Sequence, residues 1–242
     1  MSAWFLNRFR LSRRQRLPEL MDAPELPAPQ HRQALDGLRR INQWSRSVRI
    51  VWAPIWALAR QHRVRALRIL DVATGGGDVP MEVWRAARRA GLSLEIAGCD
   101  RSPTAVRYAR ERAAQLNARV TFFELDVLSD PLPSGYDVLM CSLFLHHLDE
   151  DDAVEVLGRM RQAAGELVVV NDLVRSVSGL ALAYLGTRLL SASDVVHVDG
   201  PRSVRGAYTI EEARTLAQQA GLEGATVSRR WPCRFVVAWR RA

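Results

Sequence analysis

Acidic residues end three apolar segments of this chain, and a run of glycines follows the first of them. The segments are "LRILD", which ends in Asp71 and leads into the glycines at 75–77, "LEIAGCD", which ends in Asp100, and "VTFFELD", which ends in Asp126. Glycines let a ligand lie directly on the main chain. Asp100 follows Gly77 by 23 residues, a spacing at which a carboxylate on a neighbouring strand accepts hydrogen bonds from ribose hydroxyls. These residues predict a nucleoside-binding site.

The glycine turn fits a dinucleotide poorly. Pro80 stands where the dinucleotide fingerprint has its third glycine, and Asp71 and Asp78 flank a turn whose amides would otherwise hold a pyrophosphate. Acidic neighbours favour a ligand that carries positive charge. S-adenosylmethionine carries a sulfonium and an ammonium group, so it is the expected cofactor. A nicotinamide-dependent reductase is the less favoured alternative.

Three further places on the chain carry candidates for proton transfer. His146 and His147 follow the apolar segment "YDVLMCSLFL", and an imidazole can deprotonate or orient a phenol. Because neighbouring residues do not easily point at one substrate, the alternative is that one histidine caps a helix or bonds a backbone carbonyl. Asp172 follows Asn171 at the end of "ELVVVND" and is either a base or, more simply, a helix N-cap. His197 is a candidate substrate contact or second base, with a surface turn as the alternative.

Apolar segments that alternate with amphipathic ones must position these residues. Strands apolar on both faces and separated by helix-length segments are typical of a parallel sheet covered on both sides, and ligands bind beyond the carboxyl ends of such strands. The sequence therefore predicts an α/β, Rossmann-like doubly wound sheet, mostly parallel, with a C-terminal antiparallel hairpin joined by "RRWPCR". The expected strands are 67–73, 94–100, 120–126, 136–145 and 166–172, and the expected helices are 78–90, 103–117, 150–164 and 210–220.

The N-terminal quarter of the chain, residues 1–62, is expected to cover the site as an arm and helical lid. Prolines remove backbone donors in residues 17–30, so no long helix is expected there. Apolar residues recur at helical spacing from 31 to 62, and Pro54 is expected to break these helices. The rest of the chain, residues 63–242, is the expected binding domain.

A second covering segment is expected inside the binding domain, at about residues 175–208. Its first half, "SGLALAYLGTRLL", is apolar at helical spacing. Its second half, "SDVVHVDGPRSVRGAY", is polar and is predicted to be a loop that carries His197 and Asp199 and closes over a substrate. Thr209 and Glu212 then have the spacing of a capping box at the start of the next helix.

Composition and charge limit the partners and the location. A formal net charge of +8 over 242 residues raises nucleic-acid binding as an alternative, but no aromatic platform is evident and nucleic acid is not an expected partner. The basic residues at 8–16 interleave with apolar residues from Trp4 to Leu11, so a solvated face is expected there, with contact to an anionic membrane as the alternative. No membrane-spanning stretch or signal peptide is evident, so a cytoplasmic location is expected. Three separated cysteines without CxxC spacing predict neither disulfides nor a zinc site.

Taken in order, these motifs resemble those of the class I S-adenosylmethionine-dependent methyltransferases over about residues 67–240. "DVATGGGD" is similar to their first motif, in the alanine-containing form of the ubiquinone and menaquinone methyltransferases, and "HHL" recurs after the fourth strand in many small-molecule members. The resemblance implies that the glycine turn contacts the methionyl part of the cofactor, that Asp100 holds the ribose, and that Asp126 and Val127 bracket the adenine. The residues expected around the cofactor are Asp71, Ala73, Thr74, Gly75, Gly77, Asp78, Asp100, Arg101, Asp126, Val127 and Cys141.

Segments outside this core narrow the resemblance. "PELMD", "LRRIN", "NDLVRS" and "HVDGPRSVRGAYT" resemble a bacterial group of small methyltransferases found alongside type III polyketide synthases. That likeness implies a phenolic or resorcinol-type aromatic substrate, with O-methylation as the expected reaction and C-methylation of a quinone or phenolic ring as the alternative. No metal is expected, and both a monomer and a homodimer are open. The expected catalytic candidates are His146, His147, Asp172 and His197.

Overall fold

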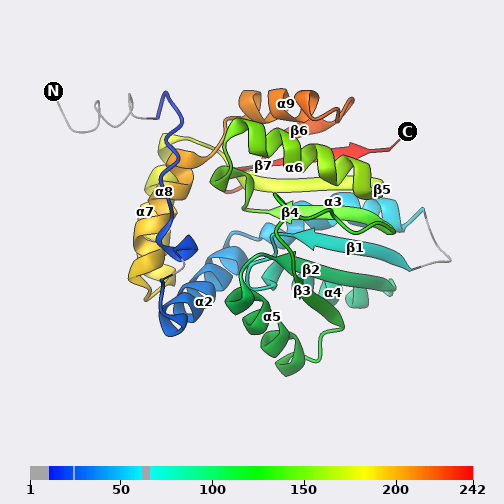
Figure 1. Cartoon of the computed structure of the whole chain (residues 1–242), viewed down its shortest axis with the longest axis horizontal. Coiled ribbons are helices and arrows are strands. Elements are labelled where there is room, and N and C mark those ends of the chain that lie inside the picture. Colours follow the sequence, from blue (N-terminus) through cyan, green and yellow to red (C-terminus); the bar gives the residue numbers. More distant parts are fainter. Residues whose placement is uncertain (1–10, 24, 62–65, 242) are drawn as a thin grey trace.

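The computed structural model describes residues 11–23, 25–61 and 66–241 and contains a seven-stranded sheet (Figure 1). The strands lie in the order β3-β2-β1-β4-β5-β7-β6. The pairs among β1 to β5 are parallel, whereas β7 is antiparallel to both β5 and β6. The expected mostly parallel sheet with a C-terminal hairpin is confirmed. The strands are β1 (Leu67–Val72), β2 (Leu94–Asp100), β3 (Val120–Glu124), β4 (Tyr136–Ser142), β5 (Ala164–Leu173), β6 (Thr226–Arg230) and β7 (Arg234–Arg240).

Helices cover both faces of the sheet, as strands that are apolar on two sides require. Val138, Leu139 and Met140 of β4 are fully buried, and burying each such side chain contributes about 2 kcal/mol relative to exposing it. The helices expected in the alternating part of the chain are confirmed to within a few residues at their ends. One face carries α3 (Ser47–Ala59), α4 (Asp78–Arg89) and α5 (Pro103–Gln115), and the other carries α6 (Glu150–Ala163) and α9 (Ile210–Gln219).

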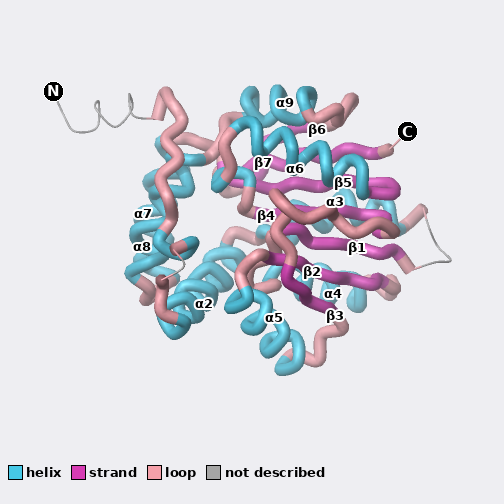
Figure 2. Tube along the Cα trace, viewed as in Figure 1, coloured by secondary structure: helices cyan, strands magenta, loops and turns pink. Residues whose placement is uncertain are grey.

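The remaining helices lie beyond the carboxyl ends of β1 to β5 (Figures 1 and 2). α7 packs against α8, and α2 packs against both. With two short 3-10 turns and the N-terminal arm, residues 11–23, they enclose the edge of the sheet at which ligands bind in folds of this kind. These elements are η1 (Leu20–Asp22), α2 (Ala28–Trp44), η2 (Leu145–His147), α7 (Val177–Leu190) and α8 (Asp194–Gly206).

Pro54 does not break the N-terminal helices, so that prediction was wrong. It lies inside α3, where Ile50, Val51 and Ile55 are buried against the sheet. This packing outweighs the backbone hydrogen bond that a proline removes. The break falls at Arg46, which has a left-handed φ of 53° and separates α2 from α3. α3 is therefore part of the core rather than of a lid.

Residues 194–206 form α8, where the sequence predicted a loop. Val195 and Val196 are buried against Ala34 of α2. This tertiary packing overrides the weak helix propensity of the glycine and the proline within the segment. His197 is thus held on a helix instead of on a mobile cover.

The segment behind the membrane-contact alternative is described only in part. Trp4, Phe5, Leu6 and Phe9 lie outside the described residues, whereas Leu11 and the basic residues up to Arg16 are described. Arg14 of this segment donates a hydrogen bond to the Gly206 carbonyl at 2.6 Å. None of the described helices is long and apolar enough to cross a membrane.

Candidate active site

A cavity of about 1260 Å³ lies at the carboxyl ends of the strands. Asp71 on β1, Asp100 on β2 and Asp126 just after β3 all line it. Parallel strands end at the same edge of a sheet, so residues at successive strand ends meet there. The structure therefore brings the three carboxylates to one shared space.

The glycine turn after β1 brings bare backbone to the cavity wall. Gly75 and Gly77 have φ angles of 54° and 73°, a conformation that glycine adopts without steric strain. A Cβ on Gly77 would lie 2.6 Å from Phe122 Cζ, whereas a Cβ on Gly75 would meet no protein atom within 4 Å. Gly75 lines the cavity and Gly77 does not. Gly77 therefore serves the packing of the turn, whereas Gly75 and Gly76 line the ligand space.

A buried and a half-buried carboxylate next to this turn, Asp71 and Asp78, each have one buried oxygen without a hydrogen-bond partner among the described residues. Asp71 Oδ2 accepts a hydrogen bond from Thr74 Oγ1 at 2.6 Å, but Asp71 Oδ1 and Asp78 Oδ1 have no partner among the described residues. Burial raises the pKa of each carboxyl group to about 7. Both residues line the cavity. An ammonium group bound there would donate to these oxygens, and the negative charge of the ionised carboxylates also favours a sulfonium.

The free energy of unfolding of the ligand-free protein is expected to fall as the pH rises from about 4 to about 7. Asp71 and Asp78 have folded-state pKa values near 7 and unfolded values near 4, so only the folded state keeps their protons in this range. Ionisation then opposes folding by on the order of 4 kcal/mol per group. Urea unfolding at pH 5 and pH 7.5 checks this. Asp78→Asn should reduce the dependence of the unfolding free energy on pH. Asp194→Asn, a control at an exposed position on α8, should leave this dependence as in the native chain. An unchanged pH dependence in Asp78→Asn would contradict the prediction.

Asp100 ties the glycine turn to the second strand. Its Oδ2 accepts a hydrogen bond from the Gly75 amide at 2.7 Å, and its Oδ1 accepts one from the Ser102 amide at 2.9 Å. Each carboxylate oxygen keeps a further lone pair. Because the side chain lines the cavity, these lone pairs are available to ligand hydroxyls.

The structure places most of the other residues predicted for the cofactor on the same wall. Ala73, Thr74, Arg101 and Val127 line the cavity. Cys141 does not, because its side chain points to the face of β4 that α6 covers and is 1% exposed in the core. Its predicted contact with the cofactor is therefore not supported.

His146 is oriented by a buried carboxylate. It follows β4 in η2, and its Nδ1 lies 2.6 Å from Oδ1 of Asp172 on β5. Burial raises the pKa of Asp172, but the charge and hydrogen bond of His146 and the hydrogen bond of the Leu173 amide outweigh this and hold the pKa below its usual value. Asp172 thus stays ionised and holds His146 through Nδ1, which turns Nε2 toward Glu19 in the cavity.

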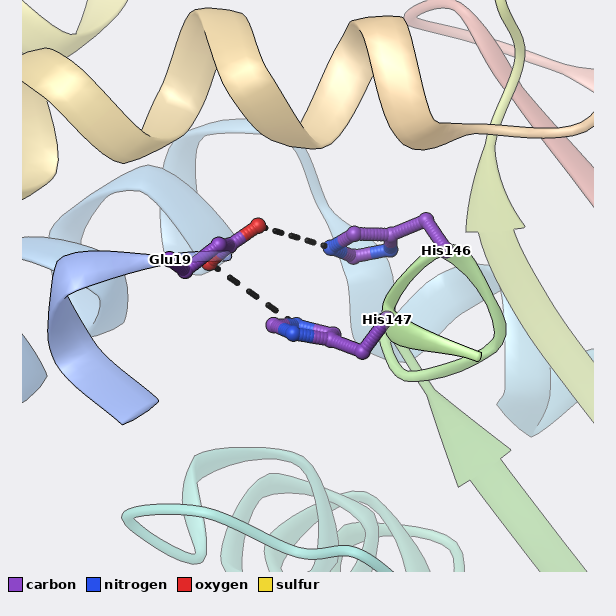
Figure 3. Close-up of side chains that lie close together, drawn as sticks. All are labelled: Glu19, His146 and His147. Carbon is purple, nitrogen blue, oxygen red and sulfur yellow. Dashed lines mark ion pairs between the residues drawn. The ribbon is translucent and has the colours of Figure 1, made fainter. Parts of the chain in front are cut away.

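The two neighbouring histidines point toward one carboxylate of the N-terminal arm (Figure 3). Nε2 of His146 is 3.7 Å from Glu19 Oε1, and Nε2 of His147 is 3.9 Å from Glu19 Oε2. The rings lie 4.3 Å apart, centroid to centroid. Both face the same way because each Nδ1 is held by its own carboxylate, Asp172 at 2.6 Å and Asp22 at 3.0 Å. Adjacent residues can therefore share one protein partner here, and whether both rings also reach one substrate stays a prediction.

His147 carries a positive charge at neutral pH. Burial lowers the pKa of His147, but the hydrogen bond to Asp22 and the charges of Glu19 and Asp22 outweigh it and raise the pKa to about 9. His147 is therefore a hydrogen-bond donor at neutral pH. One ring nitrogen of each histidine and a Glu19 carboxylate oxygen lie within 4.8 Å of one another, which is close enough to hold one divalent cation when both rings are neutral.

Two predicted catalytic residues do not reach the cavity. Asp172 contacts Nδ1 of His146 and does not line the cavity itself. It is not a helix N-cap either, because Ser176 caps α7. Nε2 of His197 lies 2.8 Å from the carbonyl oxygen of Ser191, and His197 does not line the cavity. α8 directs this side chain to the connection between α7 and α8, so the prediction of a substrate contact at His197 is not supported.

The N-terminal arm supplies site residues that were not predicted from the sequence. The amides of Leu20 and Met21 donate hydrogen bonds to Asp199 of α8, at 2.9 and 3.0 Å. These bonds fix the arm so that Glu19 and Asp22 lie against the histidines. A contact between such distant parts of the chain leaves no local pattern of spacing, and "PELMD" was informative only through its resemblance to a family motif.

Beyond the histidines, the cavity extends between α7 and the ends of β4, β5 and β7. Leu182, Ala183 and Leu190 of α7 line this part, together with Trp44 of α2. Arg234 of β7 is buried here and lines the cavity as well. The total volume exceeds the roughly 300–1,000 Å³ of a typical ligand pocket, so the cavity has room for a cofactor and a second small molecule.

Comparison with known proteins is consistent with this geometry. Residues 69–165 match the family model of a methyltransferase domain. A demethylmenaquinone methyltransferase of Deinococcus radiodurans is 31% identical over 105 residues, which are 43% of this chain and 42% of that protein. A 3-hydroxy-5-methyl-1-naphthoate 3-O-methyltransferase of Streptomyces sahachiroi is 30% identical over 112 residues, which are 44% of this chain and 31% of that protein. The match therefore spans less than half the length of these relatives.

A solved structure shares the fold over the whole chain. Magnesium protoporphyrin IX methyltransferase from Synechocystis PCC 6803, with bound SAH, superposes with a TM-score of 0.58 at 15% sequence identity. The superposition covers 100% of this chain and 95% of that chain. At this level of identity the likeness shows the fold.

Proposed function

We propose that this chain, whose residues 69–165 match the family model of a methyltransferase domain, is a class I S-adenosylmethionine-dependent methyltransferase that transfers a methyl group to a hydroxyl of an aromatic small molecule. The observation that carries the proposal is the single cavity in which strand-end carboxylates and a bare glycine turn adjoin a pair of histidines. The first set of residues suits the cofactor. The second suits an acceptor that must lose a proton.

The residues beside β1, β2 and β3 bind and orient the cofactor in this proposal. S-adenosylmethionine supplies a methyl group that its sulfonium has already activated. Asp71 and Asp78 offer their unpaired oxygens to its positive charges, and Asp100 accepts hydrogen bonds from the ribose hydroxyls. Asp126 and Val127 bracket the adenine. Gly75 lets the methionyl part lie against the backbone.

In this proposal one histidine removes the acceptor proton, and the other stabilises the negative charge that remains on the acceptor oxygen. Methyl transfer breaks the bond from carbon to sulfur and forms a bond from carbon to oxygen, so the protein mainly aligns the two molecules and removes the acceptor proton. His146 receives that proton on Nε2, because Asp172 holds its Nδ1 proton in place. The positive charge of His147 stabilises the phenolate as it forms.

The aromatic acceptor is supported by the apolar part of the cavity and by the names of the relatives. One relative is named for a naphthoate O-methylation and another for a menaquinone precursor, and the arm and α8 resemble methyltransferases found beside type III polyketide synthases. A phenolic or resorcinol-type acceptor fits these observations. Methylation of a ring carbon is the second candidate, because a carbon ortho to a phenolate is also nucleophilic and the menaquinone relative points to a quinone-type ring.

Two measurements test the proposed function. Calorimetric titration with S-adenosylhomocysteine should show saturable binding well below millimolar ligand, and mass spectrometry should detect labelled methyl transfer to resorcinols, naphthols or quinols. Absence of binding at millimolar ligand, with folded protein, overturns the proposal, and saturable NADH binding would favour a reductase. If turnover persists in the presence of a chelator, the result supports proton transfer by the histidines. If the chelator abolishes turnover and a divalent cation restores it, the histidines instead bind a metal ion. Fragmentation of the product distinguishes O- from C-methylation.

A further inference from the structure

Arg234 is a buried cation with two nitrogens that lack partners. It begins β7 opposite Leu173 of β5 and is 3% exposed. Its Nη2 donates a hydrogen bond to Ser45 Oγ at 2.8 Å, but its Nε and Nη1 have no partner among the described residues. Burial lowers the pKa of Arg234 to about 10, so the guanidinium still carries its charge at neutral pH.

Arg175, the other buried arginine that bonds across elements, has the partners that Arg234 lacks. It is 7% exposed, and its Nη1 and Nη2 donate to the Glu212 carboxylate at 2.9 and 2.6 Å. Its Nη1 also donates to the Ala207 carbonyl at 2.7 Å. A buried guanidinium with unsatisfied donors is strongly unfavourable. The charge of the buried Asp172 acts on Arg234, but Nε and Nη1 donate to no described residue. The contrast with Arg175 indicates that their missing hydrogen-bond partner is a ligand.

The place of Arg234 in the sheet separates it from the cofactor part of the cavity. β7 is three strands from β1 in the sheet order, which is roughly 14 Å at the usual spacing of about 4.8 Å between strands. Asp71 and Asp100 lie at β1 and β2, and His146 follows β4, between them and β7. A ligand group at Arg234 therefore belongs to the molecule on the far side of the histidines. Ser142 on β4 lines the wall between them, and its hydroxyl also has no partner within the described part of the chain.

The surroundings of Arg234 define the kind of group it can bind. Leu182 and Ala183 of α7 and Pro232 line the cavity with it, so the walls are suited to an aromatic ring. Nη1 and the remaining proton of Nη2 present a planar, two-pronged donor. A carboxylate accepts two parallel hydrogen bonds from such a donor and neutralises its charge.

We propose that Arg234 binds a carboxylate of the methyl acceptor, so that the preferred substrates are hydroxylated aromatic acids rather than neutral phenols. This inference rests on the proposed function and adds the acidic group of the substrate to it. The carboxylate anchors one end of the acceptor at β7, and the hydroxyl at the other end faces His146. Arg234 is thus the specificity-determining residue of the acceptor part of the cavity.

Binding of matched acids and neutral phenols, in the presence of S-adenosylhomocysteine, tests this inference. The probes are 2,4-dihydroxybenzoate against resorcinol and hydroxynaphthoate against naphthol, titrated by calorimetry. The native chain should bind the acids at least ten-fold more tightly. Arg234→Met should abolish the preference, and Arg234→Lys should keep part of it. Arg230→Met, an exposed neighbour on β6, is the matched control and should keep it all.

The outcomes separate this inference from the function on which it rests. Equal affinity of the native chain for acids and phenols overturns the role of Arg234, even if Arg234→Met does not fold. A preference that survives in Arg234→Met overturns it as well. Loss of S-adenosylhomocysteine binding in a folded Arg234→Met would show that the carboxylate belongs to the cofactor, which also overturns it. In each of these cases, methyl transfer to neutral phenols would still support the proposed function.

Discussion

Replacement of His146 by alanine is expected to slow methyl transfer about 100-fold or more and to leave cofactor binding unchanged. General-base catalysis of this kind typically contributes about 10²–10⁴-fold in rate. The ring of His146 is fixed 2.6 Å from Asp172, so the base is already aligned before the acceptor binds. Single-turnover rates at saturating cofactor and acceptor, with calorimetric affinity for S-adenosylhomocysteine, give the two quantities separately. A rate within two-fold of the native chain would show that His146 is not the base.

Other histidine and carboxylate variants distinguish catalysis from a general structural effect. His147→Ala should slow turnover less than His146→Ala and keep cofactor affinity, because it removes a charge rather than the base. Asp172→Asn should slow turnover because it no longer fixes the Nδ1 proton of His146. His197→Ala is the matched control: its ring bonds the Ser191 carbonyl outside the cavity, so turnover should stay within two-fold. A similar loss in His197→Ala would show that histidine substitution disturbs the fold.

The part of the fold that the sequence predicts well is the part in which local pattern and tertiary structure agree. Strands that are apolar on both faces can only be buried between two helical layers, so the parallel sheet and its helices followed from periodicity. The capping box of α9 is confirmed, because Thr209 and Glu212 exchange hydrogen bonds at 3.2 and 2.8 Å. Asp71 and Asp100 could be placed at one cavity for a topological reason: parallel strands end at the same edge.

The covering elements were harder to predict because their local signals oppose their packing. Pro54 and Pro201 each remove a backbone donor, yet both lie inside helices. α3 is held by its buried face against the sheet, and α8 by the contact of Val195 and Val196 with α2. Sequence spacing shows the penalty of a proline but not the neighbouring helix that compensates for it.

The residues that complete the site carry no signal in their own segments. Glu19 lies in a proline-rich arm and meets the histidines only because Asp199 fixes the neighbouring amides. Arg234 is one of 34 basic residues, and composition alone gives no reason to single it out. Its burial and its missing partners distinguish it, and both are properties of the folded chain.

Substitution of Gly75 by alanine is expected to weaken binding of S-adenosylhomocysteine at least ten-fold. An added Cβ would meet no protein atom within 4 Å, so the native protein has room for it. Because Gly75 lines the cavity, the methyl group would project into the space in which the cofactor is proposed to lie against the backbone. Calorimetric titration of the variant measures the change in affinity directly.

Gly91→Ala is the matched control, because Gly91 has a φ of 68° and also has open space around its Cβ direction, but it does not line the cavity. A left-handed φ costs an alanine about 1–2 kcal/mol, so both variants should lose similar stability in urea unfolding. Only Gly75→Ala should then lose cofactor affinity. If both variants bind S-adenosylhomocysteine like the native chain, the bare turn is needed for its own backbone conformation and not for a ligand. If both variants lose affinity equally, the loss comes from destabilisation of the fold and does not support a contact between the cofactor and Gly75.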